Sequence, residues 1–170
     1  MKSPMTPSLV LKPDPKLDLV LERVVDVPRE LVWAAWTKPE HLTKWFTPAP
    51  WTVADCEIDL RPGGIFRTVM RSPEGKEFPY ESCYLEVAKP EKLIWTRALG
   101  PGYRPMSYLP GTVDIPFTCI LTLADRGGKT DYTARVLHKD EADRKKHEDM
   151  GFHLGWSQCL DQLVEMAKQL

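Results

Sequence analysis

The chain has 170 residues, of which 42% are hydrophobic and 28% charged, and its formal net charge is −1. This length favours one folded domain that can bury a core and still enclose a cavity. The balanced charge argues against a nucleic-acid-binding protein, which normally presents a basic stripe. No secretory signal and no apolar run of about 18 residues is visible, so we expect a cytoplasmic protein with no membrane contact.

The first 16 residues contain Pro4, Pro7, Pro13 and Pro15. Each proline removes a backbone donor and fixes φ, so prolines at this density prevent regular helices and sheet ladders. We therefore expect a flexible or extended Pro-rich tail over residues 1–16, followed by one folded domain over residues 17–170.

The folded part is expected to begin with a strand over residues 17–27, where apolar residues alternate. Pro28 follows the strand and suits the first turn of a helix. Apolar residues then recur at helical spacing as far as Trp36, and Pro39 restarts the pattern. We therefore predict two short helices that are separated near residues 37–38.

Six further strands are expected, because alternating apolar runs are bounded by turn signals such as Pro62-Gly63-Gly64. Most of their connections are of hairpin length, whereas parallel strands need long crossovers, so the sheet should be antiparallel. The predicted strands cover residues 53–60, 65–71, 78–88, 92–98, 117–124 and 130–138.

The last segment, residues 141–168, is predicted to be one helix with an apolar stripe. A sheet with one apolar face must bury that face, and this helix is the only long amphipathic element left to cover it. We therefore predict an α+β helix-grip fold, in which a curved antiparallel sheet of six to seven strands surrounds a long C-terminal helix. The stripe consists of Phe152, Trp156, Cys159, Leu160, Leu163 and Ala167.

Several short motifs occur in an order that resembles a known family. They are Val27-Pro28-Arg29-Glu30-Leu31-Val32-Trp33, Pro39-Glu40-His41-Leu42 before Trp45-Phe46, Asp59-Leu60-Arg61-Pro62-Gly63-Gly64, Tyr84-Leu85-Glu86-Val87 before Pro90-Glu91-Lys92-Leu93, and Gly155-Trp156 with Leu160 and Leu163. Over about residues 17–170 the chain resembles the SRPBCC (START-like) superfamily, in the branch named after the heat-shock protein 90 ATPase activator. The resemblance implies a START-like, birch-pollen-allergen-like helix-grip fold with a hydrophobic cavity.

Members of this superfamily include ligand carriers, polyketide cyclases and co-chaperone-like proteins, so the resemblance implies no single reaction. Our first hypothesis is a protein that binds a small hydrophobic or aromatic molecule in the cavity. The second is a cyclase- or dehydratase-like enzyme that uses the same cavity. The third is a co-chaperone or stress-response module, although chaperone activators add an N-terminal client-binding domain that residues 1–16 are too few to form.

Aromatic residues are the main candidates for the cavity wall, because they give large contact areas and Trp adds one N–H donor. The alternative for each of them is an ordinary place in the core. Trp156 is favoured as a wall residue, since it lies at the centre of the stripe on the last helix. The predicted ligand-binding residues are Trp36, Trp51, Phe66, Met70, Tyr84, Trp95, Phe117, Phe152, His153 and Trp156.

Two glycines, Gly151 and Gly155, lie four residues apart within the predicted last helix. A glycine inside a helix costs roughly 1 kcal/mol relative to alanine, so some other factor must offset that cost. Either the glycines leave space for a ligand or a loop, or they allow close packing against a strand.

The segment 99–116 is expected to be an irregular loop, and long loops without structure are often functional. One interpretation is a lid over the cavity. The alternatives are a contact between two copies of the chain in a homodimer, or a mobile surface loop. Arg97 lies just before this segment and Arg104 lies within it, and either side chain could bind a ligand carboxylate through two parallel hydrogen bonds.

No catalytic set can be identified, and the enzyme hypothesis has only His153, Tyr84 and Glu86 as suspects. His153 qualifies because an imidazole can act as an acid or a base near neutral pH. Glu57 and Asp59 share one strand face, for which a solvated outer surface is the simpler interpretation.

No metal site and no other cofactor is expected. The four cysteines form no C-x-x-C pair, so we expect buried, reduced thiols. His147 and His153 are six residues apart and face different sides of the predicted helix, while His41 and His138 have no partner at ligand spacing. The expected partner is a small hydrophobic molecule, and a chaperone contact rests on the resemblance alone.

Overall fold

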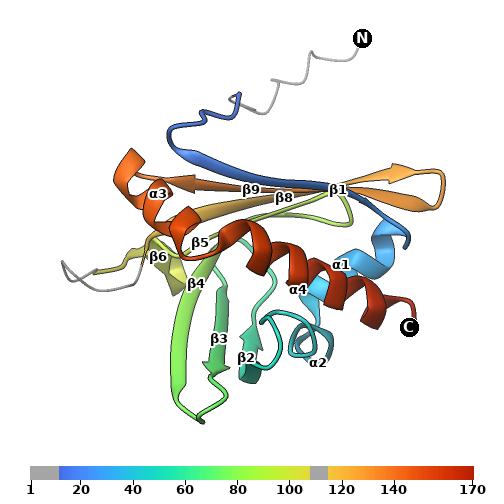
Figure 1. Cartoon of the computed structure of the whole chain (residues 1–170), viewed down its shortest axis with the longest axis horizontal. Helices are drawn as coiled ribbons and strands as arrows, with labels where there is room; N and C mark the ends of the chain where they lie inside the picture. Colours follow the sequence, from blue (N-terminus) through green and yellow to red (C-terminus); the bar gives the residue numbers. More distant parts are fainter. Residues whose placement is uncertain (1–11, 108–114) are drawn as a thin grey trace.

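The computed structural model describes residues 12–107 and 115–170, and Figure 1 shows the course of the chain. Most of the predicted tail (1–11) and the middle of the predicted loop (108–114) lie outside the described residues. The elements are β1 (Asp18–Val25), α1 (Arg29–Thr37), α2 (Pro39–Leu42), β2 (Thr52–Ile58), β3 (Ile65–Arg71), β4 (Glu77–Ala88), β5 (Lys92–Thr96), β6 (Leu99–Gly100), β7 (Arg104–Pro105), β8 (Phe117–Arg126), β9 (Lys129–His138), α3 (Glu141–Asp149) and α4 (Phe152–Ala167).

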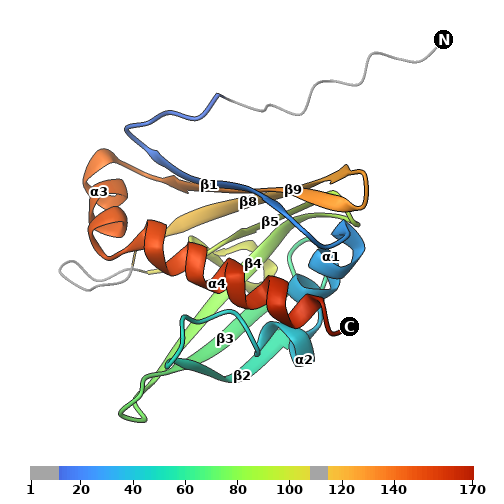
Figure 2. The same ribbon diagram turned by 45° about the vertical axis from the view of Figure 1, so that its right-hand side comes forward.

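Within the described residues, seven strands form the main sheet in the order β1-β9-β8-β5-β4-β3-β2, with every neighbouring pair antiparallel. The first strand therefore pairs with the last one, although they are far apart in sequence. Figures 1 and 2 show that the sheet is strongly bent and that α4 crosses its inner face. The predicted α+β helix-grip fold is confirmed, including the two short helices after the first strand.

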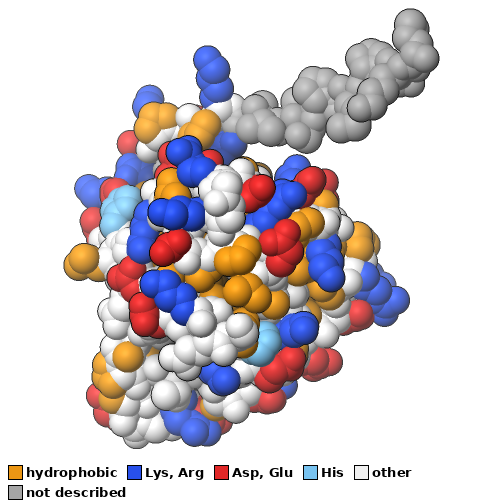
Figure 3. Space-filling model, turned by 90° about the vertical axis from the view of Figure 1, so that its right-hand side faces the viewer, with side chains coloured by type: hydrophobic (Ala, Val, Ile, Leu, Met, Phe, Trp, Pro, Cys, Tyr) orange, Lys and Arg blue, Asp and Glu red, His pale blue; other side chains and the backbone are white. Residues whose placement is uncertain are grey.

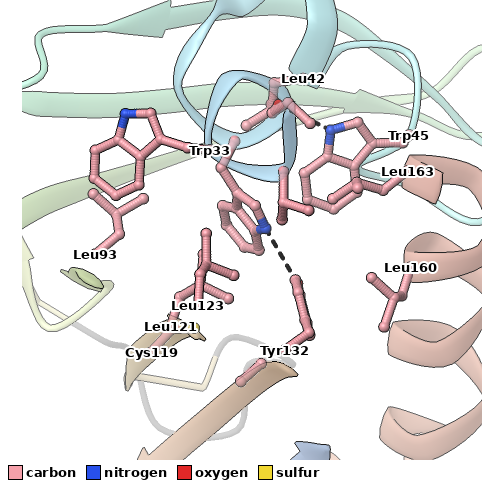
Figure 4. Close-up of a cluster of buried hydrophobic side chains, with 14 of the residues drawn as sticks. Trp33, Leu42, Trp45, Leu93, Cys119, Leu121, Leu123, Tyr132, Leu160 and Leu163 are labelled. Atoms are coloured by element: carbon pink, nitrogen blue, oxygen red, sulfur yellow. Dashed lines mark hydrogen bonds between the residues drawn. The ribbon is translucent and has the colours of Figure 1, made fainter. Parts of the chain in front are cut away.

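The inner face of the sheet is apolar because alternate residues of neighbouring strands point to the same side. Leu93, Leu121 and Ala134 are paired across β5, β8 and β9, and all three are fully buried. Leu160 and Leu163 of α4 belong to the same buried cluster and approach it from the helix side (Figure 4). Full burial of a leucine side chain is worth about 1.5–3 kcal/mol, so apolar packing anchors this part of α4.

Two buried tryptophans near α1 and α2 are held by their indole N–H groups. Trp36 Nε1 donates to the Tyr132 hydroxyl at 3.1 Å, and Trp45 Nε1 donates to the Ala35 carbonyl at 3.0 Å. Dashed lines in Figure 4 end at Tyr132 and at Trp45. Since a buried donor without a partner costs about 1–3 kcal/mol, these bonds fix α1 to β9 and the segment after α2 to α1.

The prediction of one helix over residues 141–168 is wrong, because the chain breaks at Gly151 into α3 and α4. Gly151 has a φ of 97°, which a residue with a side chain rarely adopts. None of the α3 residues is fully buried, and His147 is half-buried, so the apolar period that indicated a helix comes from α4 alone. The glycine therefore makes a turn between the two helices. A Cβ on Gly151 would meet no described atom within 4 Å, so the alternative of close packing against a strand does not hold for it.

The segment 99–107 is more regular than predicted. β6 and β7 pair across a 3-10 turn over Pro101–Tyr103. The Gly102 N–H donates to the Gly63 carbonyl at 2.8 Å, and a Cβ on Gly63 would lie 2.9 Å from the Tyr103 ring. This hairpin thus packs on the turn between β2 and β3, where the close approach of Tyr103 requires a glycine.

The two glycines near the start of α4 predict opposite effects of substitution by alanine. Gly155→Ala should raise the free energy of unfolding by about 0.5–1 kcal/mol, because helix propensity improves and a methyl group there meets no described atom within 4 Å. Gly151→Ala should lower it by about 1–2 kcal/mol, because the left-handed backbone strains a residue with a Cβ. Urea unfolding followed by circular dichroism measures both, and a destabilised Gly155→Ala would show that the space beside α4 is filled.

Candidate functional site

A cavity of about 190 Å³ lies between α4 and the inner face of the sheet. Its walls come from β3, β4, β5, β8 and β9 on one side, from α3 and α4 on the other, and from the region of α1 and α2. Most of the described lining residues are aromatic, as expected for a site that binds an apolar molecule. These aromatic residues are Trp36, Trp45, Phe46, Phe66, Tyr80, Trp95, Phe117, Tyr132 and Trp156.

The aromatic rings touch one another around the cavity. The ring centroids of Phe66 and Trp95 are 5.1 Å apart, and those of Trp95 and Phe117 are 5.5 Å apart, both in edge-to-face contact. Trp156 of α4 meets Phe117 at 6.3 Å, which links the helix to the sheet. Each such pair is worth about 0.5–1.5 kcal/mol beyond its buried area, so neighbouring rings hold each other at the cavity wall.

Two nitrogen donors belong to the wall. The Arg97 guanidinium lies 4.2 Å from the centroid of the Tyr80 ring and 5.5 Å from that of Phe117. Trp95 is only 3% exposed, and its indole N–H has no hydrogen-bond partner among the described residues. Because a buried unpaired N–H is costly, this donor is suited to a ligand that brings an acceptor.

A histidine pair joins β9 to α3 beside the cavity. His138 Nε2 lies 2.9 Å from His147 Nδ1, and His138 Nδ1 lies 2.8 Å from the Leu17 carbonyl oxygen. The His147 ring lines the cavity, with its centroid 5.1 Å from that of Phe117. Nothing in the sequence indicated this pairing, because the two histidines are nine residues apart and lie on different elements. Within the described residues, no group of three or more His, Cys, Asp or Glu side chains could hold a metal ion.

Three titratable groups of the wall have pKa values that are shifted away from neutral pH. Burial raises the pKa of the Cys159 thiol to about 12, and it raises the pKa of the Tyr132 hydroxyl as well. Burial, together with His138 and Arg97, lowers the pKa of His147 to about 4. A general acid or base works best with a pKa near the operating pH, so these three groups are unsuited to proton transfer at neutral pH.

The structure gathers six of the ten predicted ligand-binding residues at one cavity. Tyr84 and Phe152 do not line it, because both are buried in the core: Tyr84 stacks behind Phe66 at 5.5 Å, and Phe152 packs on Trp156 at 5.0 Å. The six residues at the wall are Trp36, Phe66, Met70, Trp95, Phe117 and Trp156. Their contact with a ligand stays a prediction.

Trp51 and His153 do not line this cavity. Trp51 is 36% exposed and contacts Phe78 at a centroid distance of 5.7 Å, away from the cavity. His153 points to solvent, where its Nε2 lies 2.9 Å from Glu148 Oε2. Both residues belong to apolar or aromatic stretches of the sequence, but neither side chain faces the inner side of the sheet.

The three candidate catalytic residues of the enzyme hypothesis do not lie close to one another. His153 is exposed, Glu86 forms an ion pair with Lys92 at 3.0 Å on the outer side, and Tyr84 is fully buried. They therefore supply no shared catalytic site. Glu57 is similarly occupied by an ion pair with Arg67 at 3.6 Å, and its side chain is 60% exposed, in keeping with a solvated outer face.

None of the described residues of the 99–116 segment (99–107 and 115–116) lines the cavity. Arg104 is exposed on β7 and also stays outside it. Arg97 alone of the two predicted arginines reaches the wall.

Figure 3 shows basic and acidic side chains intermingled on one face of the molecule. None of the described helices is long and apolar enough to cross a membrane.

Comparison with known proteins places these features in one family. The family model described as activator of Hsp90 ATPase homolog 1-like protein matches residues 26–168. A crystal structure of a protein from Nitrosomonas europaea is 47% identical, with a TM-score of 0.86 over 92% of this chain and 97% of that one. Among curated proteins, no relative matches the chain.

More distant structures share the fold. A crystal structure from Rhodobacter sphaeroides is 21% identical, with a TM-score of 0.78 over 93% of this chain and 96% of that one. The solution structure of an AHSA1-like protein from Aeromonas hydrophila is 17% identical, with a TM-score of 0.67 over 90% of this chain and 93% of that one.

The two buried tyrosines near the cavity predict different effects of removing a hydroxyl. Tyr132→Phe should lower the free energy of unfolding by about 1–3 kcal/mol, because the Trp36 N–H loses its partner. Tyr84→Phe is the matched control and should be neutral or stabilising, because the Tyr84 hydroxyl is buried without a described partner. Chemical unfolding measures both changes, and equal losses in the two variants would contradict the assignment of the Trp36 bond.

The low pKa of His147 predicts a loss of stability on acidification. The unfolded chain binds this proton near the ordinary value of 6.5, and the folded chain only near 4, so stability is complete above about pH 6.5 and falls as the pH drops toward 4. The part due to His147 is on the order of 3 kcal/mol. His147→Phe should flatten the dependence of unfolding free energy on pH across this window. An unchanged slope would show that His147 is not held neutral.

Proposed function

The chain belongs to the family of activator of Hsp90 ATPase homolog 1-like proteins, and we propose that it binds a small aromatic molecule in the cavity beneath α4. The observation that supports this proposal most directly is the ring of mutually packed aromatic side chains around unfilled space. Flat apolar ligands gain the most from such a wall, because stacking and edge contacts add to the burial of apolar surface.

The size of the cavity limits the ligand. An engineered cavity of about 150 Å³ in another protein admits benzene. The present cavity of about 190 Å³ is therefore suited to one aromatic ring with small substituents. Arg97 and the unpaired N–H of Trp95 would orient such a ring by binding an acceptor on it.

Binding is favoured over catalysis by the chemistry of the wall. Its thiol, its imidazole and the Tyr132 hydroxyl all have pKa values far from neutral pH. The suspected catalytic residues lie on different sides of the molecule or in the core. The proposal therefore assigns the protein the role of a receptor or carrier and not that of an enzyme.

A larger side chain that fills the cavity should prevent the ligand from binding. Cys159 lies at the wall on α4, and a phenyl group at this position fits a space that exceeds the volume needed for benzene. Cys159→Phe should therefore weaken binding of single-ring aromatic compounds at least 10-fold while the fold persists. The control is Leu154→Phe, which adds the same residue to the exposed side of α4 and should bind normally.

The measurement is a thermal-shift screen of single-ring compounds, followed by calorimetry. A ligand present at 100 times its Kd adds about 2.7 kcal/mol to the stability of the wild type. That gain corresponds to a rise of roughly 5–11 °C in Tm for a chain of this size. Equal binding by Cys159→Phe would place the ligand elsewhere, and no binding by the wild type would refute the proposal.

A further inference from the structure

The histidine pair belongs to a chain of hydrogen bonds whose direction is set at one end. The Leu17 carbonyl oxygen can only accept, so His138 Nδ1 at 2.8 Å carries a proton. A neutral imidazole has one N–H group, so His138 Nε2 is then an acceptor. His147 Nδ1, 2.9 Å away, must therefore be the donor in the second bond.

Because His147 Nδ1 carries the proton of this neutral ring, His147 Nε2 has a lone pair and no proton. Among residues 12–107 and 115–170, no hydrogen bond occupies this second nitrogen. The ring itself lies at the cavity wall, with its centroid 5.1 Å from that of Phe117 and 6.4 Å from that of Trp156. The same wall carries the N–H groups of Trp95 and Arg97 as donors.

We propose that His147 Nε2 is a specificity-determining acceptor, which selects small aromatic molecules that carry a hydroxyl group. This inference rests on the proposed binding function and adds the chemical class of the ligand. An aromatic hydroxyl fits because its O–H donates to Nε2 while its oxygen can accept from a wall N–H. A methyl or methoxy group in the same place leaves the nitrogen buried and unpaired, which costs binding free energy.

Burial keeps both rings neutral at physiological pH, as the direction of the hydrogen bonds requires. Burial is the main cause of the lowered pKa of His138, and Arg144 adds to it, whereas the Leu17 carbonyl, Asp18 and Asp143 oppose it. For His147, burial and the neighbouring His138 and Arg97 all act against protonation. A phenolic hydroxyl, with an ordinary pKa near 10, stays protonated under the same conditions and can donate.

The tautomers can be read without any ligand. Long-range ¹H–¹⁵N correlation spectra of the wild type at neutral pH should show both histidines protonated at Nδ1 and unprotonated at Nε2. An Nε2-protonated His147 would overturn the inference, whatever the protein binds. This measurement depends only on the hydrogen-bond chain and not on the proposed function.

The ligand class is tested with three probes of nearly equal shape: 4-ethylphenol, 4-ethylanisole and 1-ethyl-4-methylbenzene. Calorimetry should show that 4-ethylphenol binds at least 5-fold more tightly than the other two, since only it can donate to Nε2. In His147→Phe this preference should fall toward one. The control His153→Phe changes an exposed histidine outside the cavity and should keep the wild-type preference.

The outcomes separate the two proposals. If the three probes bind the wild type equally well, the acceptor role of His147 is refuted while the binding function stands. If none of the three binds at millimolar concentration, both proposals are refuted. If the preference for 4-ethylphenol persists in His147→Phe, another group selects the hydroxyl and the inference is wrong.

Discussion

The helix α4 is anchored by one half of its apolar stripe, and this asymmetry creates the site. Leu160 and Leu163 are fully buried against the sheet, whereas Trp156 and Cys159 are only partly buried and line the cavity. An empty void of about 190 Å³ would cost on the order of 4–5 kcal/mol. That is a large share of the roughly 5–15 kcal/mol by which proteins are stable, so occupancy of the cavity matters to the fold as well as to function.

Most of the fold could be predicted from the sequence, because the physical signals are local. Each element with such a signal buries one face, and its apolar residues recur with the matching period. Examples are the alternation along residues 65–71 and 117–124 and the stripe that begins at Phe152. The break at Gly151 could not be recognised, since a glycine is compatible both with a helix and with a left-handed turn. The hairpin over 99–105 was missed because its strands are only two residues long.

The site was less predictable, because its residues meet only through the tertiary fold. Phe66, Thr68 and Met70 alternate along β3, and all three line the cavity. This alternation could have identified Thr68 as a wall residue. The bond between His138 and His147 has no such signature, as it joins a strand end to a separate helix. The bend of the sheet decides which face of β3 and β4 is turned toward α4. Composition and residue spacing do not encode that bend.

The proposed function depends on an open space between α4 and the aromatic residues of the cavity wall. A crystal structure of the protein soaked with 4-bromophenol tests it most directly, because the anomalous signal locates the bromine without ambiguity. We expect one bromine peak in van der Waals contact with the rings of Trp95, Phe117 or Trp156, and the phenolic oxygen within hydrogen-bond distance of His147 Nε2. Side chains that fill the space, or a peak only at the outer surface, would contradict it.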